Sequence, residues 1–149
     1  MTLPTHAISG LLIGSILGHP VVGLIAGCFP DIDHLYSYVK HGYIKNWKTF
    51  YKHAFGKEDV TGDQRNILHN VLVVLLLCLI LSFILPKFFI VFSLGYISHI
   101  ILDAIDTSDY FPLYPSKIIN IKGFLDFYSY QEGILFTILL IIQLFVSFS

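Results

Sequence analysis

The chain has 149 residues, of which 55% are hydrophobic and only 13% are charged, and its mean hydropathy is +0.73. A soluble domain of this size would contain roughly a quarter charged residues, so the composition excludes that class and indicates one integral domain of the cell membrane, residues 1–149. The net charge of −1 leaves no basic surface for nucleic acid, and the two cysteines lack the spacing of a disulfide framework or a zinc knuckle.

The first apolar stretch, residues 7–29, is rich in glycine and is interrupted by Gly-His-Pro at residues 18–20. Small residues about four apart let membrane helices approach closely. The interruption is compatible with one kinked helix or with two short helices that fold back. A straight helix of this stretch would be about 35 Å long and would separate His6 from Asp31 by the width of the membrane. A re-entrant hairpin brings the two side chains together, and we predict the hairpin.

A polar segment follows and interleaves lysines with Tyr43, Trp47 and Tyr51. Alternating basic and aromatic residues are typical of an amphipathic helix that lies at the membrane interface. We predict this interfacial helix over about residues 44–55.

The apolar stretches 67–85 and 88–105 are separated by a Pro-Lys turn at residues 86–87, and a third stretch covers residues 134–148. A helix needs about 20 apolar residues to cross a bilayer, so the first two stretches predict a transmembrane hairpin and the last a shorter helix. The expected fold is therefore an all-α polytopic membrane protein. It has a re-entrant N-terminal helical hairpin, about three transmembrane helices and an interfacial helix.

Histidines and acidic residues recur at one end of the predicted helices. His69 begins one arm of the hairpin, and His99 and Asp103 end the other arm, four residues apart and therefore on one helix face. The polar segments 30–66 and 106–131 share that end. Eight of the nine lysines and arginines lie on this side and only Lys87 lies opposite, so the positive-inside rule predicts that the site faces the cytoplasm.

The side chains expected at this face are of the types that bind divalent metals. Zinc takes three or four protein ligands, usually imidazole, thiolate or carboxylate, so a larger set suits two ions that share a carboxylate. For one of Asp31 and Asp33, capping of the following helix is an equal alternative. Arg65 precedes His69 by one helical turn, where it could meet a substrate phosphate or a lipid headgroup. The candidate metal ligands are His6, Asp31, Asp33, His34, His69, His99 and Asp103.

Three motifs resemble those of the membrane-bound metal-dependent hydrolase family, which includes LexA-regulated members. They are Pro-Asp-Ile-Asp-His at residues 30–34, the Arg65 and His69 pair, and Gly-Tyr-Ile-Ser-His with Leu-Asp at residues 95–103, followed by Tyr-Pro at 114–115. The similarity covers nearly the whole chain. Gln64 stands where the middle motif of the family has a histidine.

A more distant similarity is to the zinc-dependent phospholipase C and P1-type nuclease group. This resemblance implies two zinc ions bridged by Asp103, with His6, Asp31 or Asp33, His69 and His99 as the other ligands. No counterpart of that group's later His-x-x-x-Glu motif is present, and Glu132 is interpreted as a helix-start residue.

These observations predict a hydrolase, a phosphoesterase that acts on a phospholipid or another lipid-linked phosphoester by metal-activated water. The predicted catalytic residues are Asp33, Asp103 and Arg65, and the anionic headgroup is expected to contact Arg65 or lysines such as Lys48. Two alternatives remain open. One is a non-catalytic membrane protein that binds or transports metal, and the other is a lipid-binding scaffold without metal.

Overall fold

The computed structural model describes residues 1–55 and 65–148, and Gln64 lies outside these ranges. Over the described residues the fold is all-helical, as the sequence predicts. The helices are α1 (Leu3–Ile16), α2 (Pro20–Cys28), α3 (Ile32–Lys40), α4 (Trp47–Ala54), α5 (Val71–Ile84), α6 (Phe89–Ala104) and α7 (Tyr130–Phe148), with short 3-10 helices η1 (Phe29–Asp31) and η2 (Tyr43–Lys45).

Helices α1 and α2 form an antiparallel pair whose backbones touch. A Cβ atom added to Gly10 would lie 2.3 Å from the carbonyl oxygen of Gly23, and one added to Gly23 would lie 2.2 Å from that of Gly10. Gly18 closes the turn with a φ of +75°, a left-handed conformation that glycine adopts without steric cost. The predicted reversal of the chain at residues 18–20 is thus confirmed, while its re-entrant placement in a bilayer stays a prediction.

We expect the Gly23→Ala variant to lower the free energy of unfolding by about 1–3 kcal/mol, because the added methyl group must push the two helices apart. Thermal unfolding of the purified protein in detergent measures this effect. The matched control is Gly133→Ala on α7, where an added Cβ meets no atom within 4 Å. Equal losses of stability in the two variants would contradict the close crossing.

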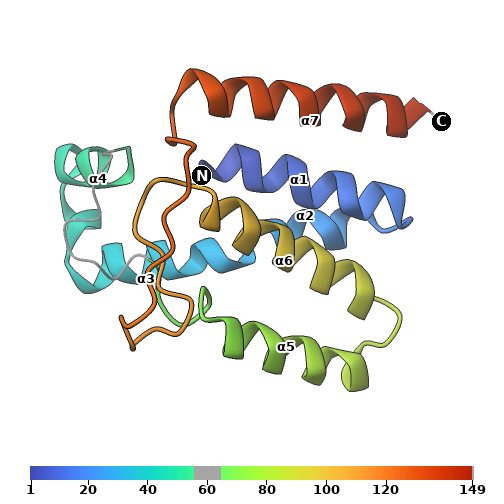
Figure 1. The fold of residues 1–149 in the computed structure, drawn as a ribbon, viewed down its shortest axis with the longest axis horizontal. Helices are drawn as coiled ribbons and strands as arrows, with labels where there is room; N and C mark the ends of the chain where they lie inside the picture. Colours follow the sequence, from blue (N-terminus) through green and yellow to red (C-terminus); the bar gives the residue numbers. More distant parts are fainter. Residues whose placement is uncertain (56–64, 149) are drawn as a thin grey trace.

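Helix α6 packs against α1, α2 and α5, and α7 packs against α1. Figure 1 shows α7, α1, α6 and α5 running side by side, with the connections grouped at the two ends of the bundle. At the end that carries the α1–α2 turn, the ring of His19 contacts that of Phe88 beside the Pro-Lys turn. At the other end, α2 and α6 finish and α1, α5 and α7 begin.

Helix length distinguishes α7 from the other apolar helices. Among the described residues, α7 with its 19 residues is the one helix that is long and apolar enough to cross a membrane, and it begins at Tyr130 rather than at residue 134 as predicted. The apolar helices α1 and α5 have 14 residues each and α6 has 16. A helix of 14 residues is about 21 Å long, which is short of the roughly 30 Å of a hydrocarbon core. The polytopic arrangement therefore stays a prediction.

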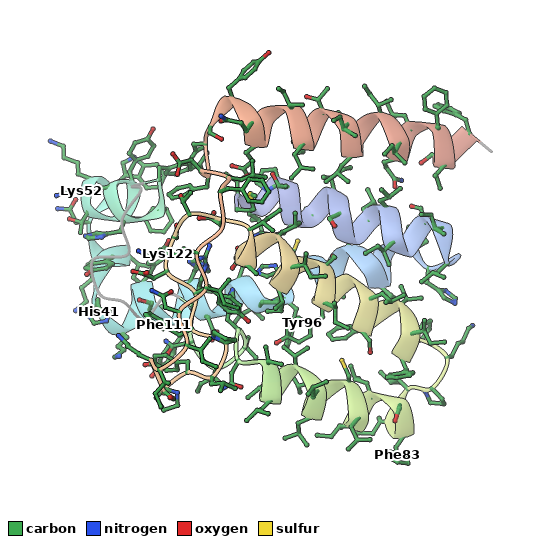
Figure 2. The ribbon with its side chains drawn as sticks, viewed as in Figure 1. His41, Lys52, Phe83, Tyr96, Phe111 and Lys122 are labelled. Carbon is green, nitrogen blue, oxygen red and sulfur yellow. The ribbon has the colours of Figure 1, made fainter. Side chains whose placement is uncertain are left out.

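Helices α3 and α4 and the segment of residues 105–129 gather at the ligand-bearing end of the bundle (Figure 1). Helix α4 lies within the range of the predicted interfacial helix and begins at Trp47. The side chain of the preceding cap residue, Asn46, accepts a hydrogen bond from the backbone N–H of Lys48. Figure 2 places Lys52 and Lys122 at this end and Phe83 of α5 at the opposite one. The charged and the apolar parts of the molecule are therefore separated along the bundle.

Candidate metal centre

The structure brings the seven predicted ligands to the end of the bundle where α2 and α6 finish. His6 comes from α1, Asp31 from η1, and Asp33 and His34 from α3, while His69 precedes α5 and His99 and Asp103 lie on the last turns of α6. The side chains of His6, His69 and His99 are completely buried, and that of Asp103 nearly so. The predicted convergence of residues about one hundred positions apart is confirmed.

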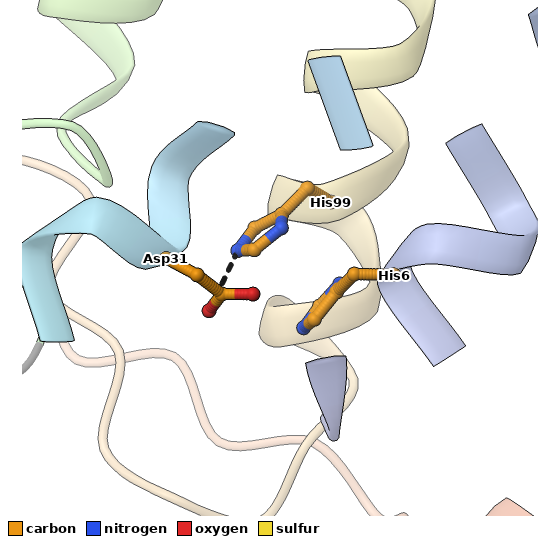
Figure 3. Close-up of side chains that lie close together, drawn as sticks. All are labelled: His6, Asp31 and His99. Atoms are coloured by element: carbon orange, nitrogen blue, oxygen red, sulfur yellow. Dashed lines mark ion pairs between the residues drawn. The ribbon is translucent and has the colours of Figure 1, made fainter. Parts of the chain in front are cut away.

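The imidazole of His99 has a defined tautomer. Its Nδ1 lies 2.7 Å from the carbonyl oxygen of Gly27, and because a carbonyl only accepts, Nδ1 carries the proton. The lone pair of His99 is then on Nε2. This nitrogen points into the cluster, 3.9 Å from Asp31 Oδ1 (Figure 3). A backbone carbonyl behind a histidine is a usual way of orienting a metal ligand.

The imidazole of His69 is held in the same way by Asp33. The Nδ1 atom of His69 lies 3.0 Å from Asp33 Oδ2, so the carboxylate accepts its proton and leaves the lone pair on Nε2. Asp33 Oδ2 also accepts hydrogen bonds from the backbone N–H groups of Asn66 (3.0 Å), Leu68 (2.8 Å) and His69 (3.2 Å). In this structure Asp33 therefore positions His69 and the segment before α5.

Two imidazole lone pairs consequently face each other. The Nε2 atoms of His69 and His99 are 3.2 Å apart, and each ring has its proton on the other nitrogen. Asp103 Oδ2 lies 3.2 Å from His69 Nε2 and 3.7 Å from His99 Nε2. Three electron-rich atoms at this spacing repel one another unless a proton or a metal ion lies between them. Ligand atoms around a tetrahedral zinc are roughly 3.3 Å apart, which matches these distances.

His6 and Asp31 add further donor atoms beside this trio. The ring of His6 stacks on that of His99 with a centroid separation of 3.6 Å (Figure 3). Its Nε2 is 3.2 Å from Asp103 Oδ1, yet within residues 1–55 and 65–148 neither ring nitrogen has a properly oriented hydrogen-bond partner. The same holds for the buried Oδ2 of Asp31. Buried polar atoms without partners are costly, and a bound metal would satisfy them.

The donor atoms form three overlapping groups, each within 4.8 Å, that could hold a metal ion: His6, Asp31 and His99; Asp31, His34 and His69; and His69, His99 and Asp103. Asp33 belongs to none of these groups, because its Oδ2 is directed at His69 and the backbone. The imidazole and carboxylate set fits a divalent cation such as zinc. Neither aspartate forms the helix cap considered above, since Asp31 stands at the cap position of α3 without a side-chain cap bond and Asp33 lies inside the helix.

Arg65 is directed at Asp103. Its Nη2 donates to Asp103 Oδ1 at 3.1 Å, and its Nε lies 2.9 Å from Oδ2, a close ion pair. The Nη1 atom faces the carbonyl oxygens of Ser108 and Asp109 at 3.5 and 3.4 Å. The guanidinium therefore balances the buried carboxylate and ties α6 to the segment that follows it.

The pKa values of two groups outside the helical bundle reflect this burial. Burial raises the pKa of Asp31, because a carboxylate removed from water is harder to ionise. Burial opposes the charged form of His69, but the carboxylates of Asp103 and Asp33 outweigh that effect and raise its pKa. Burial thus favours the neutral form of Asp31, whereas the neighbouring carboxylates favour the protonated form of His69.

A cavity of about 1000 Å³ lies beside the cluster, and Asp31, His34 and Arg65 are among its lining residues. His34 Nε2 is 3.4 Å from Asp31 Oδ1, so His34 connects the buried donors with the cavity. Lys48 is exposed on α4 and is not among the lining residues. Its predicted contact with a headgroup therefore has no support from the cavity.

Several contributors to this site are not predicted by the sequence motifs. The hydroxyl groups of Tyr96 and Tyr110 donate to the carbonyl oxygens of Leu68 (2.6 Å) and His69 (2.8 Å) and fix the turn that presents His69. Asp106 is buried with its Oδ2 3.6 Å from Arg65 Nη2 and 2.7 Å from the amino group of Met1. The spacing of three residues from Asp103, about one helical turn, could have indicated Asp106.

The comparisons with known proteins identify the family of the chain. The family model described as YdjM inner membrane protein matches residues 1–149, the whole chain. Comparison with the curated proteins and with the solved structures gave no match. The match agrees with the membrane location predicted from the composition, while hydrolysis stays a prediction. The chain belongs to the YdjM inner membrane protein family.

Proposed function

We propose that the protein is an integral, polytopic metal-dependent hydrolase that cleaves a phosphoester, a phospholipid or another lipid-linked phosphate, at a site facing the cytoplasm. The observation that carries the proposal is the pair of imidazole lone pairs turned toward each other beside a buried carboxylate. The Nε2 atoms of His69 and His99 are 3.2 Å apart, and Asp103 Oδ2 lies within 3.7 Å of both. A purely structural polar cluster would place a donor between such acceptors.

The residues that would hold the metal are His69, His99 and Asp103. A second ion would use Asp31 together with His6 or with His34. Divalent zinc bound to such residues polarises a phosphoryl oxygen and lowers the pKa of a water molecule, which makes it a nucleophile near neutral pH. Within this chain, Asp33 keeps the proton of His69 on Nδ1, and Gly27 does the same for His99. Arg65 beside Asp103 supplies a fixed positive charge where a phosphate would approach.

The cavity and the membrane family favour a lipid-borne substrate over a soluble one. Asp31 and His34 reach the cavity from the buried cluster, whereas Leu35 and Phe50 give it an apolar wall. A substrate with a phosphate at one end and an apolar body matches this distribution.

We expect the purified protein to contain a divalent metal, to hydrolyse phospholipid, and to lose hydrolysis on treatment with a chelator and regain it with added zinc. Elemental analysis and a phosphate-release assay on phosphatidylglycerol vesicles measure these properties. Thermal unfolding before and after chelation separates loss of metal from loss of fold. A folded protein that contains no metal, or hydrolysis that is indifferent to chelation, would reject the proposal.

A further inference from the structure

The cavity beside the metal-ligand cluster has one polar end and one apolar wall. Its polar end contains Asp31, His34 and Arg65, which belong to or contact the cluster. The apolar wall comes from α3, α4 and the segment before α7, through Leu35, Tyr38, Phe50, Phe55, Phe127 and Tyr128. A volume of about 1000 Å³ is at the upper end of the range for small-molecule sites and is large enough for an extended acyl chain.

The apolar side chains of this wall are left open rather than packed. Leu35, Phe55 and Tyr128 are exposed by 56%, 47% and 54% of their surface, although all three line the same cavity. The rings of Phe55 and Tyr128 are 5.9 Å apart and join α4 to the segment that precedes α7. Apolar side chains that converge on one cavity without filling it are typical of a site for an apolar ligand.

The backbone of Tyr128 is held in an unfavourable conformation that keeps its ring at this wall. Its φ is +54°, a left-handed value that costs free energy for a residue with a bulky side chain. The backbone N–H of Tyr128 donates to Glu132 Oε2 at 2.7 Å. The other oxygen of Glu132, Oε1, accepts from the hydroxyl groups of Thr2 and Thr5, both at 2.8 Å, which anchors it to α1.

The lining of the cavity also offers a lysine to an anionic headgroup. Lys122 lines the cavity, lies among the connecting segments in Figure 2, and has its Nζ 2.9 Å from Asp109 Oδ1. Both side chains are more than half exposed, and exposed pairs of this kind hold together weakly, so Lys122 is available to a phosphate. The tail and the headgroup of one lipid would therefore find matching surfaces within a single cavity.

We propose that this cavity binds one acyl chain of a phospholipid against Phe55 and Tyr128, with the phosphate directed toward Asp31 and His34. The direction of the phosphate rests on the proposed function, whereas binding of the acyl chain does not. The lipid enters from the membrane interface beside the amphipathic helix α4. The acyl chain of the lipid then moves from the bilayer into the cavity, and the phosphate comes to lie near the buried donor atoms.

The test uses the full-length, chelator-treated protein in nanodiscs of phosphatidylethanolamine and phosphatidylglycerol. The nanodiscs contain a trace of phosphatidylglycerol with a photoreactive diazirine in one acyl chain. After illumination we expect labelled peptides from residues 50–55 and 127–128. Tyr128→Asn removes the ring while tolerating the left-handed backbone, and it should lower labelling of residues 50–55 about five- to tenfold. Tyr130→Asn is the matched control, because Tyr130 is 83% exposed and lies outside the cavity.

A second pair of variants covers the case in which Tyr128→Asn does not fold. Phe55→Ala should lower labelling at residues 127–128, and Phe124→Ala, which alters an exposed ring outside the cavity, should not. Wild-type label confined to α5 and α7, or equal labelling in each variant and its control, would overturn the inference. Labelling of the cavity in protein that shows no hydrolysis would support chain binding and reject only the proposed function. If hydrolysis of a long-chain phospholipid required Asp103 but was unchanged by Phe55→Ala and Tyr128→Asn, the proposed function would be supported and binding of the acyl chain in the cavity would be rejected.

Discussion

Asp103→Asn is expected to lower kcat/KM for phospholipid hydrolysis by about 10²- to 10⁴-fold, the rate equivalent of the several kcal/mol that a metal contributes to charge stabilisation. The substitution preserves shape but removes the charge that faces His6, His69 and Arg65, each within 3.2 Å of a carboxylate oxygen. The bound metal should also decrease, because a neutral amide is a poor ligand for zinc. Elemental analysis and kinetics on the same preparation measure both effects.

The control for Asp103→Asn is Asp126→Asn. Asp126 is exposed, accepts a hydrogen bond from the hydroxyl of Thr107, and belongs to none of the groups of described residues that could hold a metal. It should leave metal content and kcat/KM unchanged. If the two variants retained the same activity and metal, Asp103 would be a structural partner of Arg65 and the proposed centre would be wrong.

Asp33→Asn is expected to weaken metal binding by about 10- to 100-fold without changing the number of metals bound at saturation. Loss of a group that orients a liganding histidine has effects of this size. An amide cannot replace a carboxylate oxygen that accepts four hydrogen bonds, from three backbone N–H groups and the imidazole of His69. Hydrogen bonds to a charged group contribute about 1.5–3 kcal/mol, so the free energy of unfolding should fall as well.

Titration of chelator-treated protein with zinc measures the affinity and the stoichiometry of Asp33→Asn separately. A double-mutant cycle with His69→Ala tests the route of the effect. Because Asp33 contacts the cluster through His69, the two losses of affinity should not add. Additive losses, or a lower stoichiometry at saturation, would make Asp33 a direct ligand, as the sequence motif alone suggests.

The location of the site can be predicted from the apolar stretches and turn residues of the sequence. The turns at residues 18–20 and 86–87 reverse apolar stretches, and these reversals bring His6, Asp31, His69 and His99 to one end of the bundle. Apolar stretches and turn residues are local signals, so the chain path can be predicted from them. The sequence predicts a start at residue 134 for the last helix, four residues too late, because Tyr130 to Gly133 are less apolar than the residues that follow.

The separate roles of the site residues could not be predicted from such local patterns. Whether Asp31 or Asp33 belongs to the candidate ligand groups depends on the path of residues 66–69, whose N–H groups turn toward Asp33 Oδ2. Arg65 could be expected near a phosphate, but only the packed structure shows that its guanidinium lies on Asp103. The sequence predicts Glu132 as a helix-start residue. In the structure its carboxylate accepts hydrogen bonds from Thr2 and Thr5 near the N-terminus and from the backbone of Tyr128. Such contacts link segments far apart in the sequence and have no local pattern.

The donors of this candidate centre come from four separate parts of the chain, so a bound metal would link metal supply to folding. An ion held by His69, His99 and Asp103 would tie the start of α5 to the end of α6, and an ion held by His6, Asp31 and His99 would tie α1 and η1 to α6. An unfolded chain cannot offer these connections. Preferential binding to the native state stabilises a protein by about 2.7 kcal/mol when the free ligand is at 100 times its dissociation constant. Metal-starved cells would therefore hold less of this protein, since the apo form opens more often to proteases.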